Sequence, residues 1–291
     1  MEEKGLIEMS KGKAYYILSK FRLSMLTAFS GAFGYCLAVE SVHWVALGLV
    51  MLAGFLMSAS ASAINQIIEV ESDKLMKRTM SRPLPLGILS RNEAIIFSIV
   101  TGVAAVIIFF GYFNAKTGVL AVLSLVLYAF VYTPLKKKGP IAVFVGAFPG
   151  AFPPMIGWLA ATNKFGLEPG ILFAIQFFWQ FPHFWAIAWV ANEDYQSAGF
   201  KLLPGAGKKD LNTVIQMMIY TLFLLPVCWL PYYLKMTGIN SGVIAMTCAV
   251  LFLAQVFNLM RKVSDKAALQ LMFGSFLFLP IVQIAYLLDK I

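Results

Sequence analysis

Charged residues are scarce in this 291-residue chain. Asp, Glu, Lys and Arg make up 13% of it, whereas hydrophobic residues make up 60%. Soluble globular domains carry about 25% charged residues, so the composition excludes that class and indicates a membrane protein. Acidic residues are the rarest, with 14 against 23 basic residues and a net charge of +9. An excess of basic residues can indicate nucleic-acid binding, but in membrane proteins it more often lies in cytoplasmic loops.

Cysteine is also rare, and its positions exclude two kinds of site. Cys36, Cys228 and Cys248 lie inside apolar segments and show no CxxC spacing, so neither a disulfide framework nor a zinc site is expected. The acidic start, Met1-Glu2-Glu3-Lys4, argues against a mitochondrial presequence. The first apolar run has the length of a full span, which argues against a cleavable signal peptide.

Long apolar runs fill most of the chain. About 20 apolar residues cross a bilayer as a helix, and nine such segments predict an all-α integral membrane protein with nine transmembrane helices. Prolines in the fifth and sixth segments, at positions 149, 153, 154 and 182, predict kinks or broken helices there. The predicted spans cover residues 23–39, 44–64, 94–113, 118–135, 140–161, 170–190, 213–234, 240–259 and 268–288.

Basic residues divide unequally between the two sides that these spans define. With the N-terminus inside, 19 of the 23 Lys and Arg residues lie in inside segments. Cytoplasmic loops carry such an excess, so we expect a cytoplasmic N-terminus and an outside C-terminus. The expected location is the inner (plasma) membrane of a prokaryote. Residues 1–291 then form one domain. Its long inner loops, 65–93 and 191–212, carry seven of the 14 acidic residues, which predicts an active site on the cytoplasmic side.

The most informative motif opens the first inner loop. Asn65, Glu69 and Asp73 are spaced four apart, so a helix carries them on one face, and Glu71 points elsewhere. Oxygen ligands of this kind suit Mg2+, which shares its coordination with substrate phosphates. Three basic residues that can hold phosphate oxygens follow in the same loop: Lys77, Arg78 and Arg82. The motif predicts a magnesium–diphosphate site at the membrane surface; the alternative is a solvated helix of mixed charge.

Further polar residues lie at the inner ends of other spans. Glu193 and Asp194 follow the sixth span, where they predict a second Mg2+ on the same diphosphate or, alternatively, an ordinary polar loop. Lys136 belongs to a basic run, 136–138, that is either a topology signal, an anionic-lipid contact or a phosphate contact. Lys20, directly before the first span, has the same interpretations.

His183 lies inside the sixth span, at a depth where a titratable group is costly and by default functional. It could ligate or orient a heme, act as a base, or form a hydrogen bond between helices. Gln176 and Gln180 share its face of the helix, at spacings of seven and three. The aromatic residues around it suit packing as well as a flat porphyrin or a polyprenyl tail.

Four blocks combine these residues into one pattern. They are Asn65-Gln66-x-x-Glu69-x-x-x-Asp73 with Met76-Lys77-Arg78-Thr79 and Arg82-Pro83-Leu84; Tyr132-Thr133-x-Leu135-Lys136; Gly146, Gly150-Ala151, Pro153-Pro154 and Gly157-Trp158; and Pro182-His183-Phe184-Trp185 with Glu193-Asp194-Tyr195-x-x-Ala198-Gly199 and Leu203-Pro204. The pattern resembles the UbiA-type intramembrane prenyltransferases, and within them the heme-modifying branch. It covers most of residues 20–204. The sequence differs from the family's usual residues at Lys20-Phe21-Arg22, 139–142 and 200–203. These differences affect the geometry of the loops and the acceptor pocket.

The resemblance implies a UbiA-like helical bundle and an Mg2+-dependent enzyme. Its reaction would transfer the farnesyl group of farnesyl diphosphate to a vinyl group of heme b, with addition of water, giving heme O and diphosphate. In the implied site Asn65, Glu69, Asp73 and Asp194 are catalytic and, with Glu193, hold Mg2+, while Lys77, Arg78, Arg82 and Lys136 bind diphosphate, and His183 and Tyr195 bind heme. The implied partners are both substrates, the lipid bilayer and, as candidates, heme A synthase or heme–copper oxidase assembly factors, with no nucleic acid.

Two other functions stay open. A sibling prenyltransferase acting on an aromatic quinone precursor would use the same diphosphate site. A secondary transporter would use the intramembrane His183 with half-helices near Pro149 and Pro182. Transporter charges are expected near the midplane, whereas here the charged residues cluster at one face.

Overall fold

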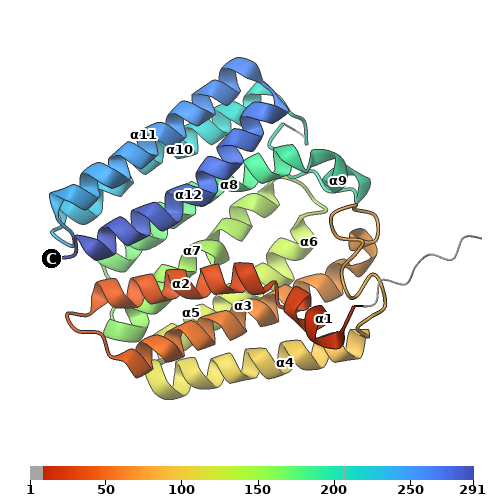
Figure 1. Ribbon diagram of the computed structural model, residues 1–291, viewed down its shortest axis with the longest axis horizontal. Helices are drawn as coiled ribbons and strands as arrows, with labels where there is room; N and C mark the ends of the chain where they lie inside the picture. The colour runs from red at the N-terminus through yellow and green to blue at the C-terminus, as the bar shows by residue number, and fades with distance from the viewer. Residues whose placement is uncertain (1–8, 206) are drawn as a thin grey trace, which may run out of the picture.

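Long helices lying side by side make up the architecture (Figure 1). The computed structural model describes residues 9–205 and 207–291, so the acidic start of the chain, residues 1–4, lies outside the described residues. The long helices are α2 (Phe21–Ala38), α3 (Trp44–Asp73), α4 (Arg91–Ile108), α5 (Ala115–Val126), α7 (Ile141–Thr162), α8 (Leu167–Val190), α10 (Leu211–Tyr233), α11 (Ile239–Lys262) and α12 (Asp265–Leu288). The shorter elements are α1 (Lys11–Leu18), α6 (Thr133–Leu135), α9 (Asn192–Ser197) and the π-helical turns η1 (Phe109–Phe113) and η2 (Leu127–Tyr132).

Eight helical segments within the described residues are long and apolar enough to cross a membrane. They coincide with the second to ninth predicted spans, with η1 extending α4, and η2 and α6 extending α5. The first predicted span forms α2, which is not among the eight because Arg22 and several hydroxyl residues make it less apolar. Helix α2 nevertheless packs against α3 and α7 (Figure 1). The ninth span and the sides of the two termini therefore stay predictions.

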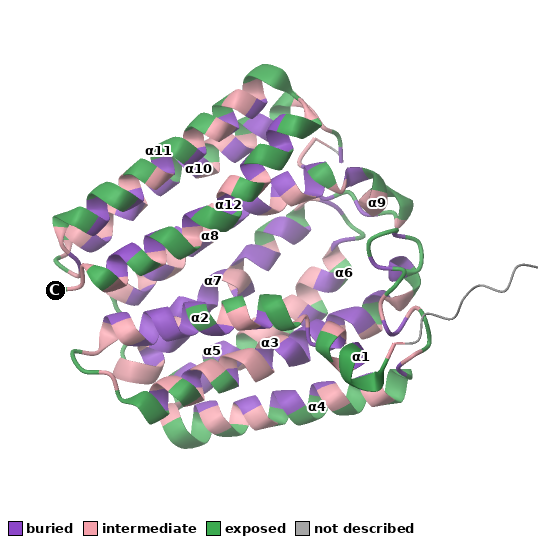
Figure 2. Cartoon of the chain, viewed as in Figure 1, coloured by how far each residue is buried: buried purple, intermediate pink, exposed green. Residues whose placement is uncertain are grey.

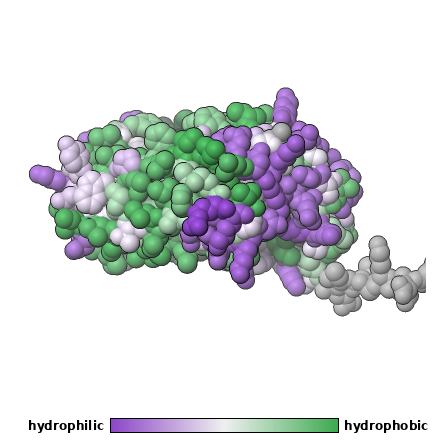
Figure 3. All heavy atoms as spheres, turned by 90° about the horizontal axis from the view of Figure 1, so that it is seen from above, coloured by the Kyte–Doolittle hydropathy of each residue, from purple (hydrophilic) through white to green (hydrophobic). Residues whose placement is uncertain are grey.

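Apolar side chains cover the outside of the bundle as well as its inside. Figure 2 shows exposed residues along the outer turns of the long helices, and many of them are large hydrophobics, such as Leu26 and Leu277 at 60% and 63% exposure. Figure 3 shows a broad hydrophobic surface, with hydrophilic atoms gathered toward the end that carries α1 and α9. Such an apolar surface is that of a protein surrounded by lipid.

Glycine lets α2 and α7 approach each other closely. A Cβ atom on Gly157 would overlap the carbonyl oxygen of Gly31, and one on Gly34 would overlap the carbonyl oxygen of Pro154. Small residues let the backbones of membrane helices come into direct contact. The contact holds α2 against the centre of the bundle.

Helices α7 and α8 continue through their prolines, so the predicted breaks are absent. A proline cannot donate to the carbonyl four residues earlier, and Pro154 therefore leaves the carbonyl of Gly150 free. Gln176 Nε2 donates to that oxygen at 2.7 Å. The proline before it frees the carbonyl of Pro149, to which Ser124 Oγ donates at 3.2 Å. Neighbouring helices thus replace two lost backbone hydrogen bonds, as burial in a membrane requires.

The glycine contact predicts a destabilising substitution. Gly157→Ala places a methyl group against the α2 backbone, and overpacking of this kind costs about 1–3 kcal/mol. We expect a lower midpoint of thermal unfolding in detergent. Gly48→Ala in α3 is the control, since its Cβ would meet nothing within 4 Å. Equal midpoints for the two variants would contradict the close α2–α7 contact.

Candidate active site

The C-terminal end of α3 carries three buried polar side chains on one face. Asn65, Glu69 and Asp73 are 1%, 5% and 0% exposed. Glu71, in contrast, is exposed and pairs with Lys74 at 2.8 Å. The predicted placement of these three residues on one face of the helix, with Glu71 pointing elsewhere, is therefore confirmed.

Both buried carboxylates are paired with a cation. Nη1 of Arg82 lies 2.7 Å from Oδ2 of Asp73, and Nζ of Lys136 lies 2.9 and 3.1 Å from the two oxygens of Glu69. Burial alone would lower the pKa of Lys136, but the neighbouring Tyr132 and Glu69 outweigh it and raise that pKa. A buried charge is costly unless it is paired. These pairs therefore tie the loop after α3, and the segment after α6, to the end of α3.

Lys20 completes this cluster, although the sequence left its role open. Its Nζ donates to Asn65 Oδ1 at 3.0 Å and lies 3.4 Å from the hydroxyl of Tyr128. Asn65 Nδ2 donates in turn to Thr133 Oγ1 at 3.1 Å. Burial, together with nearby Arg82, lowers the pKa of Lys20. The Lys20 backbone has φ +45°, a left-handed conformation that costs roughly 1–2 kcal/mol in a residue with a Cβ atom. No local sequence pattern signals this turn.

A π-helical turn forms the wall between this cluster and the interior. It is η2, which ends one residue before Thr133, and single π turns within helices are frequent at functional sites. The ring centroid of Tyr132 lies 4.8 Å from Lys136 Nζ. Tyr128 and Tyr132 also line the cavity described below. The two tyrosines therefore contact both the charged cluster and the apolar interior.

The two long loops meet through Asp194. Its Oδ1 and Oδ2 accept hydrogen bonds from the backbone N–H groups of Lys77 and Arg78, both at 2.9 Å. Ser197 Oγ also donates to the carbonyl of Leu75 at 3.0 Å. Helix α9 is thereby docked on the turn that follows α3. That Asp194 also ligates Mg2+ stays a prediction.

The remaining predicted residues of the second loop lie nearer to solvent. Arg78 lies with its guanidinium 5.5 Å from the ring centroid of Tyr195 and donates to the Tyr195 hydroxyl at 3.3 Å. Glu193 and Lys77 are exposed. Tyr195 therefore contacts Arg78, which is predicted to bind diphosphate. The binding of heme by Tyr195 stays a prediction.

The donor set at the end of α3 fits Mg2+. Asp73 Oδ1 is buried and has no hydrogen-bond partner within residues 9–205 and 207–291. One amide oxygen and two carboxylates are hard oxygen donors, and Mg2+ commonly binds one or two protein carboxylates while phosphates and waters supply the rest. No cluster of three or more His, Cys, Asp or Glu suited to a metal occurs in the described parts of the chain. Substrate phosphates would therefore have to complete the coordination.

An apolar cavity of about 840 Å3 extends from the two tyrosines into the bundle. Helices α2, α3, α5, α7, α8 and α12 supply most of its lining. Its volume lies within the range of small-molecule pockets. Leu26 and Phe276 line it and are 60% and 46% exposed, so the cavity opens onto the lipid-facing surface. It suits a large apolar ligand that enters from the membrane.

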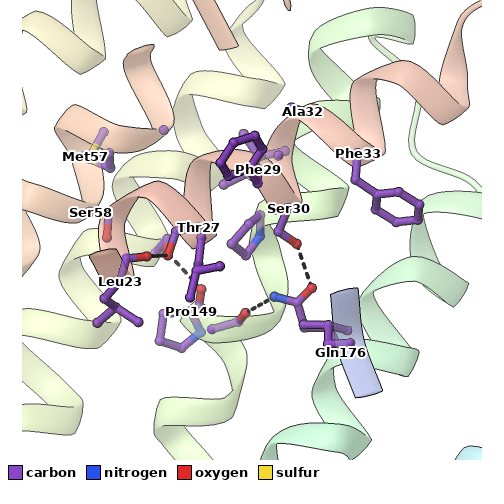
Figure 4. A pocket seen from close by; sticks show the side chains of 18 of the residues that line it. Leu23, Thr27, Phe29, Ser30, Ala32, Phe33, Met57, Ser58, Pro149 and Gln176 are labelled. Carbon is purple, nitrogen blue, oxygen red and sulfur yellow. Dashed lines mark hydrogen bonds between the residues drawn. The ribbon is translucent and has the colours of Figure 1, made fainter. Parts of the chain in front are cut away.

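Polar side chains cross-link the helices around this cavity. Ser30 Oγ donates to Gln176 Oε1 at 2.8 Å (Figure 4). Gln283 Nε2 lies 3.3 Å from the same oxygen. Gln176, Gln180 and His183 all line the cavity, which confirms their predicted common face. Gln176 therefore joins α2, α7, α8 and α12.

Comparison with protein families supports one assignment. Residues 24–279 match the model of the UbiA prenyltransferase family. The chain is 56% identical over 283 residues to a protein of Cytophaga hutchinsonii named protoheme IX farnesyltransferase, with coverage of 97% of this chain and 99% of that one. It is 41% identical to the protein of the same name from Christiangramia forsetii, covering 94% and 92% of the two chains.

Solved structures share the fold at lower identity. A digeranylgeranylglyceryl phosphate synthase superposes with a TM-score of 0.81 at 22% identity, covering 97% of this chain and 99% of the other. A UbiA homologue from Archaeoglobus fulgidus, solved with DMAPP and Mg2+, gives a TM-score of 0.66 at 16% identity, with coverage of 94% and 98%. At these identities the likeness concerns the fold.

The loop contact predicts a local change in hydrogen exchange. Asp194→Ala removes the acceptor of two backbone N–H groups, and hydrogen bonds to a charged group contribute about 1.5–3 kcal/mol each. In metal-free protein we expect the amides of Lys77 and Arg78 to exchange more than ~10-fold faster. Glu193→Ala, which removes the exposed neighbouring carboxylate, is the control. Unchanged exchange in Asp194→Ala would show that α9 does not hold this turn.

Proposed function

We propose that this chain, which belongs to the UbiA prenyltransferase family, transfers the farnesyl group of farnesyl diphosphate to a vinyl group of heme b. Water adds in the same reaction, and the products are heme O and diphosphate. The observation that carries the proposal is the cluster of paired carboxylates and cations at one end of a large apolar cavity. Heme b is proposed as the acceptor because relatives named protoheme IX farnesyltransferase are up to 56% identical to this chain.

Asn65, Glu69 and Asp73 would hold one Mg2+, and Asp194 with Glu193 would hold a second. Bound Mg2+ would neutralise the phosphate oxygens and stabilise the charge that develops on the leaving group. Oδ1 of Asp73, which is buried and has no hydrogen-bond partner among the described residues, supports this assignment. So does the A. fulgidus UbiA homologue, which was solved with Mg2+.

The chain's own cations would hold the diphosphate. Arg82 and Lys136 already lie beside the carboxylates, with Lys20 next to them. Arg78 offers a planar guanidinium suited to bidentate phosphate contacts, and Lys77 adds a point charge. These groups would stabilise diphosphate as the allylic C–O bond breaks.

The apolar cavity would protect the farnesyl cation that this bond cleavage leaves. Its lining of mostly apolar side chains excludes bulk water from the cation. The terminal carbon of the heme vinyl group forms a bond to C1 of the farnesyl group, and the positive charge moves to the adjacent vinyl carbon. Water adds there and loses a proton, which gives the hydroxyethylfarnesyl group of heme O.

We further propose that the charged end faces the cytoplasm of a bacterial cell and that α2 is the ninth span. Basic residues concentrate at this end, as they do in cytoplasmic loops. With nine spans, the N-terminus lies inside and the C-terminus outside.

A direct assay tests the function. Purified protein in detergent is incubated with heme b, farnesyl diphosphate and Mg2+, and heme products are followed by chromatography and mass spectrometry. We expect a farnesylated, hydrated heme that forms only with Mg2+ and disappears with EDTA. An aromatic quinone precursor that is prenylated while heme b is left unchanged would favour the sibling function.

Asp73 provides a sharper test of the metal site. Asp73→Asn keeps the shape of the side chain but removes its charge, and loss of one transition-state-stabilising group lowers turnover by about 100- to 1,000-fold. We expect a loss of this size in Mg2+-dependent product formation. Glu71→Gln, an exposed change on the same helix, should keep normal turnover. Equal activities of the two variants would contradict the metal assignment.

A further inference from the structure

We infer that the ring of Phe109 closes the far end of one branch of the cavity and thereby sets the length of the prenyl chain that the protein accepts. The inference rests on the proposed function, in which the donor is a prenyl diphosphate. It goes further by naming the residue that selects three isoprene units over four. The observations that carry it are the course of this branch below the carboxylates of α3 and the side chains at which it ends.

The branch begins directly below the predicted metal-binding face of α3. Ala61 and Ser58 line the cavity and precede Asn65 by four and seven residues, so they lie on the same face of the helix as Asn65. Both side chains are small, which leaves room beside the helix. A prenyl chain whose diphosphate is held at Asn65, Glu69 and Asp73 would therefore extend along this face.

The opposite walls of the branch come from the η2–α5 segment and from α7. Tyr132 and Gly146 mark its inner end, where a Cβ atom on Gly146 would lie 2.7 Å from Cδ2 of Tyr132. Ala121 and Ile156 line the cavity eleven and ten residues away from them along these two segments, which corresponds to about 15 Å on each side. This length is comparable to that of an extended chain of three isoprene units.

An apolar cluster closes the outer end of the branch. Met57, Phe109, Ala121 and Ile156 all line the cavity and belong to one cluster of buried side chains. Phe109 has the largest side chain of the four and is 1% exposed. The other three come from the helices that form the walls, whereas Phe109 comes from the first residue of η1. Its ring therefore lies across the end of the branch.

The turn that carries Phe109 is tied to two of these walls through Asn114. The backbone N–H of Asn114 donates to the carbonyl of Phe109 at 3.1 Å. Asn114 Nδ2 donates to the carbonyl of Leu159 in α7 at 2.8 Å, and Asn114 Oδ1 accepts from the backbone N–H of Thr117 in α5 at 3.0 Å. Overpacking against a fixed wall is unfavourable. The ring can therefore exclude a chain that is one isoprene unit too long.

Helix α2 limits the branch on its remaining side. A Cβ atom on Gly31 would lie 3.6 Å from the carbonyl oxygen of Pro153 and 3.6 Å from Cγ1 of Val50, so α2, α7 and α3 meet there at van der Waals distance. Phe276, which also lines the cavity, belongs to α12, and α12 packs on α2 and α8. In Figure 1, α2 and α7 lie between α12 and α3. Phe276 therefore offers a matched control on the other side of the cavity.

Competition between prenyl diphosphates tests the inference. Full-length protein in nanodiscs receives heme b, Mg2+ and equal amounts of geranyl, farnesyl and geranylgeranyl diphosphate, and mass spectrometry of the prenylated hemes gives the ratios of kcat/KM. We expect the wild type to prefer farnesyl diphosphate. Phe109→Ala should raise the kcat/KM for geranylgeranyl relative to farnesyl diphosphate at least ~10-fold, because one methylene in a hydrophobic pocket already changes selectivity about 10- to 200-fold.

A second variant should shift the preference in the opposite direction. Ser58 is half-buried and lies ~10 Å along the helix from Asn65, so Ser58→Leu fills the branch before its end. We expect the preference to move from farnesyl toward geranyl diphosphate by at least ~10-fold. Ser58→Leu also decides the question if Phe109→Ala does not fold. Phe276→Ala, which removes the same kind of ring from α12, should keep the wild-type ratios.

The possible outcomes separate the inference from the proposed function. Unchanged ratios in Phe109→Ala and Ser58→Leu, or a wild type that prefers geranylgeranyl diphosphate, overturn the inference. A larger shift in Phe276→Ala than in Phe109→Ala also overturns it, because the chain would then lie beside α12. If the wild type forms no prenylated heme, the proposed function is wrong. The Mg2+-dependent affinities of the same variants for the three diphosphates, measured without heme, then still test the length limit.

Discussion

Burial of two carboxylates at the end of α3 is the constraint on which the active site depends. Glu69 and Asp73 are almost completely buried, and buried charges are stable only when they are paired. Their partners, Lys136 and Arg82, come from two different connections, and Lys20 joins them from a third. One helix face therefore organises three segments that are distant in the sequence. The cations are held there before any diphosphate arrives.

Buried polar groups inside the bundle also need partners, and there the groups are backbone carbonyls. Proline frees the oxygen of Gly150, and Gln176 satisfies it while also accepting from Ser30. Several polar side chains of the membrane interior thus serve the helices that line the cavity. His183 differs, because one ring nitrogen meets Ser275 and the other has no partner among the described residues.

Much of this arrangement could be predicted from the sequence, because it depends on side-chain type and spacing. The lengths of the apolar runs located eight of the nine predicted spans, and the four-residue spacing placed Asn65, Glu69 and Asp73 on one buried face. Lys20 could not be assigned, since its position depends on a left-handed turn that no local pattern signals. The contact of Asp194 with the first loop was equally hidden. Its partners are backbone N–H groups, which every residue except proline possesses.

The charge balance of the ligand-free site indicates in what order Mg2+ and diphosphate would bind. Two carboxylates and three cations leave the cluster with one excess positive charge. Arg82 and Lys136 are paired with the carboxylates that would hold Mg2+, so the proposed site favours joint binding of Mg2+ and diphosphate. Mg2+ would take over the carboxylate oxygens, while the released cations would turn to the phosphate oxygens. Glu69, Asp73, Arg82 and Lys136 would then each keep a partner of opposite charge throughout. Mg2+ alone would displace the cations without giving them a new partner, which favours binding of the metal–diphosphate pair over the metal alone.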